Sequence, residues 1–321
     1  MTRIRSLLSL VVLEIILAGL CVLLAAAAPN FLSGANLLNV LRNVSMQGLI
    51  ALGMTPVIIA GEIDLSVGSM VAFSGCLTAW LTGALGPAGL GLAMPFAVGT
   101  AILSSLAAGF ASGTLAGLLR NRYGVPSFIS TLALLTALSG AAELITNGFP
   151  LTPFPAWYNF IGGGYLLGVP FPAILFLLAF TVTHILMNYT SFGRAVYAVG
   201  GNAEAARLSA IDVGRVRVAV LAVTAMLAAA SGVMQSSEIM SGTATTAKGW
   251  ELDVIAAVII GGTSLAGGVG RVWGTMVGVV FLGVIMNGMT LMNVSEYWQH
   301  VVRGGLILFA VLINRMERRQ R

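Results

Sequence analysis

The densest group of polar side chains in an otherwise apolar stretch lies in Gly61–Ser69. Two carboxylates, Glu62 and Asp64, and the hydroxyl of Ser66 stand there between apolar segments. Acids and glycines at this place predict an interrupted helix, whose freed backbone groups must be satisfied by neighbouring protein or by water. In transporters such breaks commonly line the substrate route. The alternative is a tight surface loop in which Asp64 or Ser66 caps the next helix, and the two roles are compatible.

A second polar segment, Gly193–Asp212, predicts a short amphipathic helix within a loop. Asn202 is a favourable N-cap residue, and Glu204 with Arg207 forms a pair of opposite charges at i,i+3 spacing. One face of this helix is apolar and comprises Ala205, Leu208 and Ile211. Such a face needs a cover. Lipid headgroups, the remainder of the chain and a soluble partner are equally compatible with the periodicity.

Asn287 is an isolated amide in the middle of a long apolar run. A polar side chain inside a membrane is costly and usually faces the protein interior or a water-filled cavity. We therefore group Asn287 with Glu62, Asp64 and Ser66 as candidate residues of a translocation pathway or its gate.

Sequence motifs for catalysis and nucleotide binding are absent. The chain has no Gly-x-x-x-x-Gly-Lys-Ser/Thr loop and no His-Glu-x-x-His motif, and it lacks a Gly-x-Ser-x-Gly elbow. Its two cysteines and two histidines are isolated, which argues against a disulfide framework or a metal cluster. We therefore expect a protein that is not an enzyme and that holds no cofactor or metal of its own.

The composition places the chain in a lipid bilayer. Of its 321 residues 58% are apolar and 8% are charged, whereas roughly 25% of the residues of a soluble domain are charged. The mean hydropathy is +0.97. The net charge of +5 does not indicate a nucleic-acid partner, because the basic residues separate apolar runs and form no solvated face.

Apolar runs predict ten spans of about 20 to 25 residues, which leaves no room for a separate soluble domain. The first, Leu7–Ala28, is longer than the apolar region of a typical signal peptide, so we expect it to be retained. Residues 44–85 could instead form a broken helix pair. The other expected spans are Val44–Ala60, Ser66–Leu85, Ala88–Leu119, Phe128–Thr146, Phe171–Tyr189, Arg217–Ile239, Leu252–Leu265, Gly270–Met292 and Trp298–Ile313.

The distribution of basic residues supports an even number of spans. With ten spans and a cytoplasmic start, thirteen of the sixteen Lys and Arg residues fall on the cytoplasmic side, where such residues are enriched. The three on or near the outer side are Arg42, Lys248 and Arg303. Both termini are therefore predicted to be cytoplasmic.

Small residues predict close helix packing at two places. Glycines recur at four-residue spacing in two runs, and such ridges let helix backbones approach closely in a membrane. The spacing does not say whether the partner helix belongs to the same chain or to a second copy. The glycines are Gly109, Gly113 and Gly117 in one run and Gly270, Gly274 and Gly278 in the other.

A short internal echo links two segments of the chain. Val57–Gly61 reads Val-Ile-Ile-Ala-Gly, and Val258–Gly262 reads Val-Ile-Ile-Gly-Gly. Five easily substituted positions leave an internal duplication unproven.

Three stretches, Leu49–Ser69, Gly193–Ile211 and Glu251–Gly274, resemble the permease family of bacterial sugar ABC importers. These are the ribose/xylose/galactose-type permeases, which are related to branched-chain amino-acid permeases. The sequence departs from the family pattern in two places. It has Gly-Glu-Ile-Asp at Gly61–Asp64 where Gly-Gly-Ile-Asp is common, and Thr-Leu-Ala at Thr131–Ala133 where Thr-Leu-Gly and a following arginine are common.

The resemblance implies an all-α integral membrane protein of the bacterial inner membrane, with a single permease domain over residues 1–321 and about ten transmembrane helices. Implied partners are an ATP-binding subunit that uses ATP and Mg²⁺, a periplasmic sugar-binding protein, and a second permease copy or sister permease. The loop at about residues 193–212 then resembles a cytoplasmic coupling helix. Its candidate ATPase-coupling residues are Gly200, Gly201, Asn202, Glu204, Ala205, Ala206, Arg207, Leu208, Ser209 and Ile211.

The expected function is therefore the translocation subunit for a monosaccharide, powered through contact with a separate ATPase. Because the binding protein would supply affinity, we expect a glycine-rich, apolar route with few fixed sugar contacts. The alternative is an ion-coupled secondary transporter of a small polar solute. It requires paired intramembrane charges, and the sequence shows none. A membrane-embedded enzyme would need a nucleophile cluster or a metal set, which is also missing.

Overall fold

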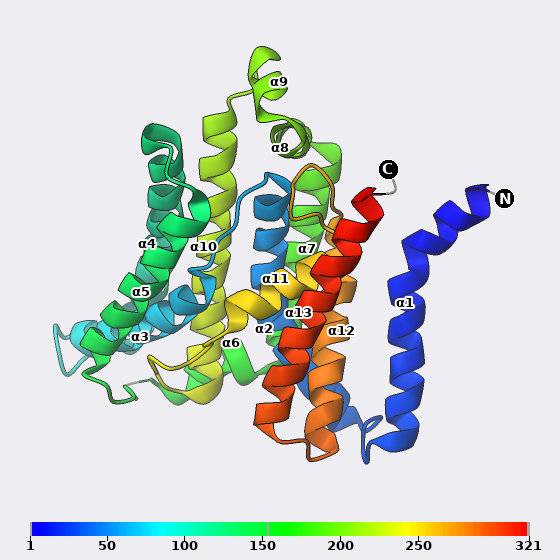
Figure 1. Cartoon of the computed structure of the whole chain (residues 1–321). Helices are drawn as coiled ribbons and strands as arrows, with labels where there is room; N and C mark the ends of the chain where they lie inside the picture. Colours follow the sequence, from blue (N-terminus) through cyan, green and yellow to red (C-terminus); the bar gives the residue numbers. More distant parts are fainter. Residues whose placement is uncertain (1, 153, 320–321) are drawn as a thin grey trace.

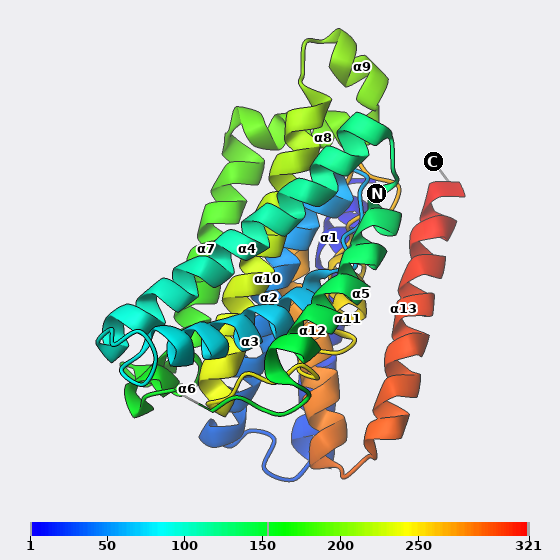
Figure 2. The same cartoon turned by 90° about the vertical axis from the view of Figure 1, so that its left-hand side faces the viewer.

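The computed structural model describes the backbone of residues 2–152 and 154–319, and the side chains of residues 12–152, 154–309 and 312. Long helices run along the bundle or obliquely through it (Figures 1 and 2). They are α1 (Thr2–Ala27), α2 (Gly34–Ile59), α3 (Val67–Leu85), α4 (Met94–Tyr123), α5 (Ser127–Thr146), α7 (Phe171–Tyr189), α10 (Val213–Ile239), α11 (Trp250–Ile260), α12 (Val272–Leu291) and α13 (Glu296–Arg319).

Short elements fill two of the connections. Between α5 and α7 lie the 3-10 helix η1 (Ala156–Asn159), helix α6 (Phe160–Gly163) and an antiparallel hairpin of β1 (Tyr165–Leu166) and β2 (Val169–Pro170). Between α7 and α10 lie α8 (Ser191–Gly201) and α9 (Ala203–Leu208), which project at one end of the bundle (Figure 1).

Helix lengths confirm a polytopic all-α membrane protein. Among the described residues, six helices are long and apolar enough to cross a membrane, namely α3, α4, α5, α7, α10 and α12. Helix α11 has 11 residues. At about 1.5 Å per residue it rises only about 17 Å, whereas the hydrocarbon core is about 30 Å thick. The predicted count of ten spans thus stays a prediction.

The start of α2 and the end of α11 differ from the predicted boundaries. Helix α2 begins at Gly34, ten residues before the predicted span, because its first turns carry Asn36, Asn39, Arg42 and Asn43 and lack the apolar signal. Helix α11 ends at Ile260, before the predicted end at Leu265.

Helix α2 forms the centre of the bundle. Its residues from Val44 to Ile59 are almost all buried, which is typical of a helix that is surrounded by other helices. Helices α7, α10, α11 and α12 pack around it, and α10 in turn packs against α3 and α4. A buried hydrogen bond of 2.7 Å joins the hydroxyls of Thr55 on α2 and Thr275 on α12.

The first glycine ridge packs within the chain. A Cβ atom at Gly109, Gly113 or Gly117 of α4 would overlap α10. This settles the partner that the sequence left open. In the second run, Gly274 and Gly278 of α12 lie against Gly261 and Ala257, while Gly270 precedes α12 and is not part of that helix.

The internal echo has a local explanation. Helices α2 and α11 end with the same hydrogen bonds, because the N–H of Glu62 reaches the carbonyl of Val57 and the N–H of Thr263 reaches the carbonyl of Val258. Gly61 and Gly262 occupy the left-handed position of this motif, with φ of +78° and +91°. The similar residues of Val57–Gly61 and Val258–Gly262 therefore form the same helix-ending turn, and they do not require a duplicated domain.

The close approach of α4 and α10 predicts that a larger side chain lowers stability at a glycine that faces α10 and not at a glycine of α4 that faces open space. Replacing Gly113 with Val should lower the stability of the purified protein by about 1–3 kcal/mol, the usual cost of overpacking, because its Cβ would meet the backbone of Leu221 and Ala222. Gly99→Val on the same helix is the control, since open space surrounds Gly99. Thermal unfolding in detergent measures both. Equal melting temperatures for the two variants would contradict this packing.

Candidate functional site

The projecting end of the molecule is built from α8 and α9. Asn202 caps α9 as predicted, since its Oδ1 accepts hydrogen bonds from the backbone N–H groups of Glu204 and Ala205, both at 3.0 Å. The predicted pair is also present, with 2.6 Å between Arg207 Nη2 and Glu204 Oε1. The hydrogen bond and charge of Arg207 hold the pKa of the Glu204 carboxyl below its ordinary value.

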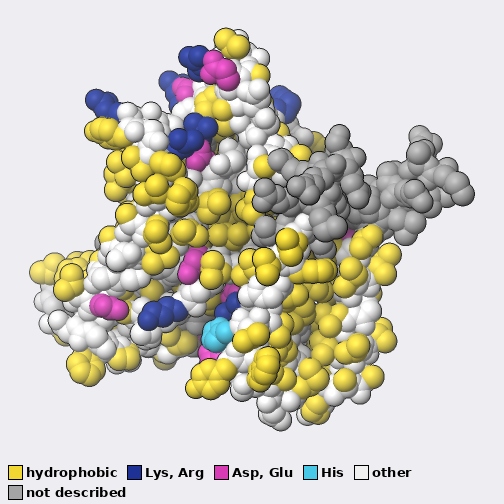
Figure 3. Space-filling view, in the orientation of Figure 1, with side chains coloured by type: hydrophobic (Ala, Val, Ile, Leu, Met, Phe, Trp, Pro, Cys, Tyr) yellow, Lys and Arg dark blue, Asp and Glu magenta, His cyan; other side chains and the backbone are white. Residues whose placement is uncertain are grey.

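The predicted apolar face is divided between the bundle and the surroundings. Ile211 lies beyond the end of α9 and is partly buried against the core, together with the fully packed Ala206. Ala205 is exposed, and 79% of Leu208 is exposed. The prediction that Ile211 shares a helical face with Leu208 is therefore wrong, because α9 ends at Leu208. The chain's own bundle covers one part and leaves Leu208 uncovered at the projecting end, where apolar and charged side chains lie side by side on the surface (Figure 3).

Helix α8 rests directly on the backbone of two other segments. Gly200 lies against the carbonyl of Ile59, and a Cβ atom there would overlap it. The same Ile59 carbonyl accepts a hydrogen bond of 2.8 Å from the N–H of Gly268. One turn earlier, the Tyr197 hydroxyl donates to the carbonyl of Gly270 at 2.9 Å. The projecting segment thus contacts both the end of α2 and the loop that joins α11 to α12.

The break after α2 carries a buried charge cluster. The Glu62 side chain is 3% exposed, and its Oε1 lies 3.0 Å from Arg120 Nε and 2.7 Å from Arg217 Nε. Glu62 thereby ties the end of α2 to the last turn of α4 and the first turns of α10. Sequence analysis placed both arginines on the cytoplasmic side and did not pair them with Glu62, because the three residues are far apart in sequence.

The rest of the break is held by α5. The backbone N–H of Ile63 donates to Ser127 Oγ at 3.1 Å, and that of Leu65 donates to Thr131 Oγ1 at 3.0 Å. Neighbouring protein therefore satisfies the freed backbone groups, as expected of an interrupted helix. Thr131 belongs to the stretch that departs from the family pattern.

Asp64 and Ser66 form one local unit. Asp64 is fully buried, and its Oδ1 accepts hydrogen bonds from Ser66 N at 2.8 Å and Ser66 Oγ at 2.6 Å. Its Oδ2 has no partner among the described residues. Ser66 occupies the N-cap position of α3 but makes no side-chain capping bond. The N-terminal turn of α3 is thus organised through Asp64.

Asn287 lies apart from the other three pathway candidates. It exchanges two hydrogen bonds with Asn36 on α2, of 2.8 Å and 3.0 Å. It also lines a cavity whose walls do not include Glu62, Asp64 or Ser66. The structure therefore does not bring the four predicted residues together.

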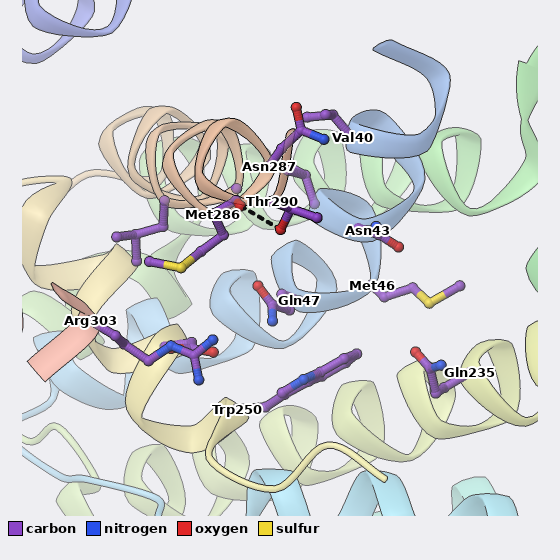
Figure 4. Close-up of a pocket in the computed structure, with 14 residues that line it drawn as sticks. Val40, Asn43, Met46, Gln47, Gln235, Trp250, Met286, Asn287, Thr290 and Arg303 are labelled. Carbon is purple, nitrogen blue, oxygen red and sulfur yellow. Dashed lines mark hydrogen bonds and ion pairs between the residues drawn. The ribbon is translucent and has the colours of Figure 1, made fainter. Parts of the chain in front are cut away.

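The cavity of about 300 Å³ lies between α2, α10, α11, α12 and α13 (Figure 4). Its polar lining includes Asn43, Gln47, Gln235, Trp250, Asp253 and Arg303. Sequence analysis missed this set. Asn43 and Gln47 lie four residues apart on α2, and Trp250 and Asp253 lie three apart on α11, but these pairs and the other residues come from distant parts of the chain.

Sequence analysis found no paired intramembrane charges, whereas the folded helices pair two arginines with acids. Arg303 Nε on α13 lies 2.7 Å from Asp253 Oδ1 on α11, and Arg42 Nη1 lies 3.6 Å from Glu238 Oε1. The partners are 50 or more residues apart in sequence, so spacing could not reveal them. Paired charges therefore do not by themselves decide between the two classes of transporter.

Comparison with known proteins distinguishes these classes. Residues 36–311 match the family described as "Branched-chain amino acid transport system / permease component". The chain is 41% identical to the ribose import permease protein RbsC of Bacillus subtilis over 299 residues, which cover 92% of this chain and 89% of the relative.

Two further relatives carry names for other sugars. The L-arabinose ABC transporter permease protein AraH of Azospirillum brasilense is 37% identical, with 93% of this chain and 85% of the relative covered. The xylose transport system permease protein XylH of Haemophilus influenzae is 32% identical, with 94% and 95% covered. No solved structure matches the chain. By this similarity over nearly its whole length, the chain belongs to the family described as "Branched-chain amino acid transport system / permease component", and within it the chain is similar to permeases of monosaccharide ABC importers.

Proposed function

We propose that this chain is the membrane-spanning subunit of an ABC importer and forms the route through which a monosaccharide crosses the bacterial inner membrane. The observation that carries the proposal is its similarity, over more than nine tenths of its length, to permease proteins named for ribose, L-arabinose and xylose. These names share one chemical class, the neutral monosaccharide. The ion-coupled alternative has no comparable support.

The proposed partners follow from this role. An ATP-binding subunit hydrolyses ATP with Mg²⁺, a periplasmic binding protein delivers the sugar, and a second permease copy or a sister permease completes the membrane part. Both termini are proposed to be cytoplasmic. This orientation is supported by the described ends of α1 and α13, which lie toward the same end of the bundle as α8 and α9 (Figure 1).

The geometry supports a mechanical route for the energy. The exposed Leu208 and the Glu204–Arg207 pair are placed to meet the ATP-binding subunit. Movement of α8 would pass directly to the end of α2 and to the loop before α12, because backbone contacts at Gly200 leave no flexible side chain between them. The break and its Glu62 cluster adjoin this junction, and their rearrangement would open the route toward the cytoplasm.

Leu208 supplies a test of the coupling surface. Leu208→Asp should prevent co-purification of the ATP-binding subunit and abolish ATP-driven uptake, because it places a charge in an apolar contact. Leu90→Asp is the matched control, since Leu90 is 77% exposed in the loop between α3 and α4. Exchanging Glu204 and Arg207 for one another keeps their mutual pair and should also uncouple uptake. Normal uptake by both variants would remove the coupling assignment.

The Glu62 cluster predicts a selective loss of stability. Glu62→Gln leaves Arg120 and Arg217 facing each other without their shared carboxylate. The loss should be about 1–3 kcal/mol, less than for a fully buried pair because both arginines are partly exposed. Glu204→Gln is the control and should change thermal unfolding little, because that pair is exposed. Equal unfolding of both variants in detergent would show that the cluster carries no stability.

Orientation can be tested by chemical labelling. In intact cells, Ser209→Cys should react only with a thiol reagent that enters the cytoplasm, whereas Ser139→Cys within α5 should be protected from both sides. The unsubstituted chain measures the background from Cys21 and Cys76. Labelling of Ser209→Cys by an impermeant reagent would reverse the proposed orientation.

A further inference from the structure

The cavity in Figure 4 is lined by helices that meet only in the folded chain. It lies in the half of the bundle away from α8 and α9, between the first half of α2, the end of α10, the start of α11, the last turns of α12 and the first half of α13. Its volume of about 300 Å³ is at the small end of the range for ligand pockets. This size suits a single sugar ring and not a nucleotide or an oligosaccharide.

Besides Asn287, three side-chain amides line this space. Asn43 and Gln47 come from α2, and Gln235 comes from α10 (Figure 4). No hydrogen bond joins any of these amides to another described residue. Each amide offers two N–H donors and one carbonyl acceptor. Such groups form pairs of hydrogen bonds with neighbouring hydroxyls, each of which donates and accepts.

A charged pair and an aromatic ring complete the polar wall. Asp253 is 7% exposed, and its Oδ1 lies 2.7 Å from Arg303 Nε. Because the two charges neutralise one another, the cavity gains strong donors and acceptors without a net charge. Trp250 lies one turn before Asp253 on α11 and adds a flat apolar face and an indole N–H.

The remaining lining residues are apolar or already hydrogen-bonded within the chain. Val44, Met46, Leu282 and Met286 present hydrocarbon and thioether surface. The Asn287 amide faces the cavity but is bound to Asn36, so it holds α12 against α2 and is not free to bind a solute. Asn287, which was predicted as a pathway residue, therefore positions α12 in the cavity wall, and the other polar lining residues supply the contacts to a solute.

The geometry points to a binding site for one neutral monosaccharide within this cavity, with the ring stacked near Trp250 and its hydroxyls bound by Asn43, Gln47, Gln235 and the Asp253–Arg303 pair. The inference rests on the proposed function and adds an intermediate stop in the outer half of the route. A neutral polyhydroxyl compound matches the free amides and the neutralised charges. An anion or a cation would have to compete with the internal pair.

The test uses weak-binding measurements on the whole chain in lipid nanodiscs, with D-ribose, L-arabinose and D-xylose as probes and ribose 5-phosphate as the charged comparison. Saturation-transfer NMR should detect the neutral sugars and not the phosphate. The double variant Gln47→Met and Gln235→Met keeps side-chain length and should weaken binding about 30-fold, because it removes at least two hydrogen bonds of about 1 kcal/mol each and about 1.4 kcal/mol corresponds to a factor of ten. Asn188→Leu, an amide replacement at an exposed position of α7, should leave binding unchanged.

A second variant guards against a folding defect. Met286→Trp fills the cavity without removing a polar group, and it too should abolish sugar binding while the protein elutes as the unaltered chain does. Unchanged binding in both cavity variants would overturn the site. Equally, sugar uptake by the complete importer without any binding to the permease alone would overturn the site and leave the proposed function standing. Binding to the cavity without sugar uptake by the complete importer would support the site and count against the proposed function.

Discussion

The structure depends on one backbone contact, where Gly200 of α8 meets the carbonyl of Ile59 at the end of α2. Because glycine has no Cβ, the two chains approach until backbone touches backbone. The Ile59 carbonyl also binds the N–H of Gly268, so three segments meet at this point. A permease that is moved by a separate ATP-binding subunit, as proposed here, needs such a rigid junction. Side chains between the two backbones would absorb a small displacement by changing rotamer.

Two kinds of polar site follow from this arrangement. Near the junction, charges on separate helices lock the break through Glu62, and hydroxyls of α5 satisfy its backbone. In the far half, the cavity around Gln47 leaves its amides open. The first site holds helices together and the second leaves hydrogen-bonding capacity for a solute. This division fits the proposed permease, which must change conformation at one end and bind a solute at the other.

Much of this organisation was predictable from local sequence, and the remainder depends on contacts between distant residues. The Asn202 cap and the Glu204–Arg207 pair lie within one turn, so spacing alone predicted both. The interrupted helix after α2 was likewise predictable from acids and glycines in an apolar setting. By contrast, the start of α2 was missed because its first turns are polar, and Asn36 and Arg42 find their partners Asn287 and Glu238 only in the folded chain.

Long-range pairing explains the failures at the site. Asp253 and Arg303 are separated by 50 residues, and Glu62 finds its partners on α4 and α10. The distribution of basic residues predicted only the side of the membrane on which each lies, and this does not distinguish a solvated arginine from one that pairs with a buried acid. Ile211 was misplaced for a different reason, since the helix that should have carried it ends at Leu208.

The stoichiometry of the Glu62 cluster has a consequence for electrical insulation. One carboxylate faces two guanidinium groups, so these three side chains together carry one net positive charge. A negative interior potential drives cations inward by about 2.3 kcal/mol per charge for each 100 mV, and a fixed positive charge opposes their approach. An uncharged solute experiences neither force. The same arginines that fasten the helices can thereby limit the leak of protons and sodium ions through an opening bundle.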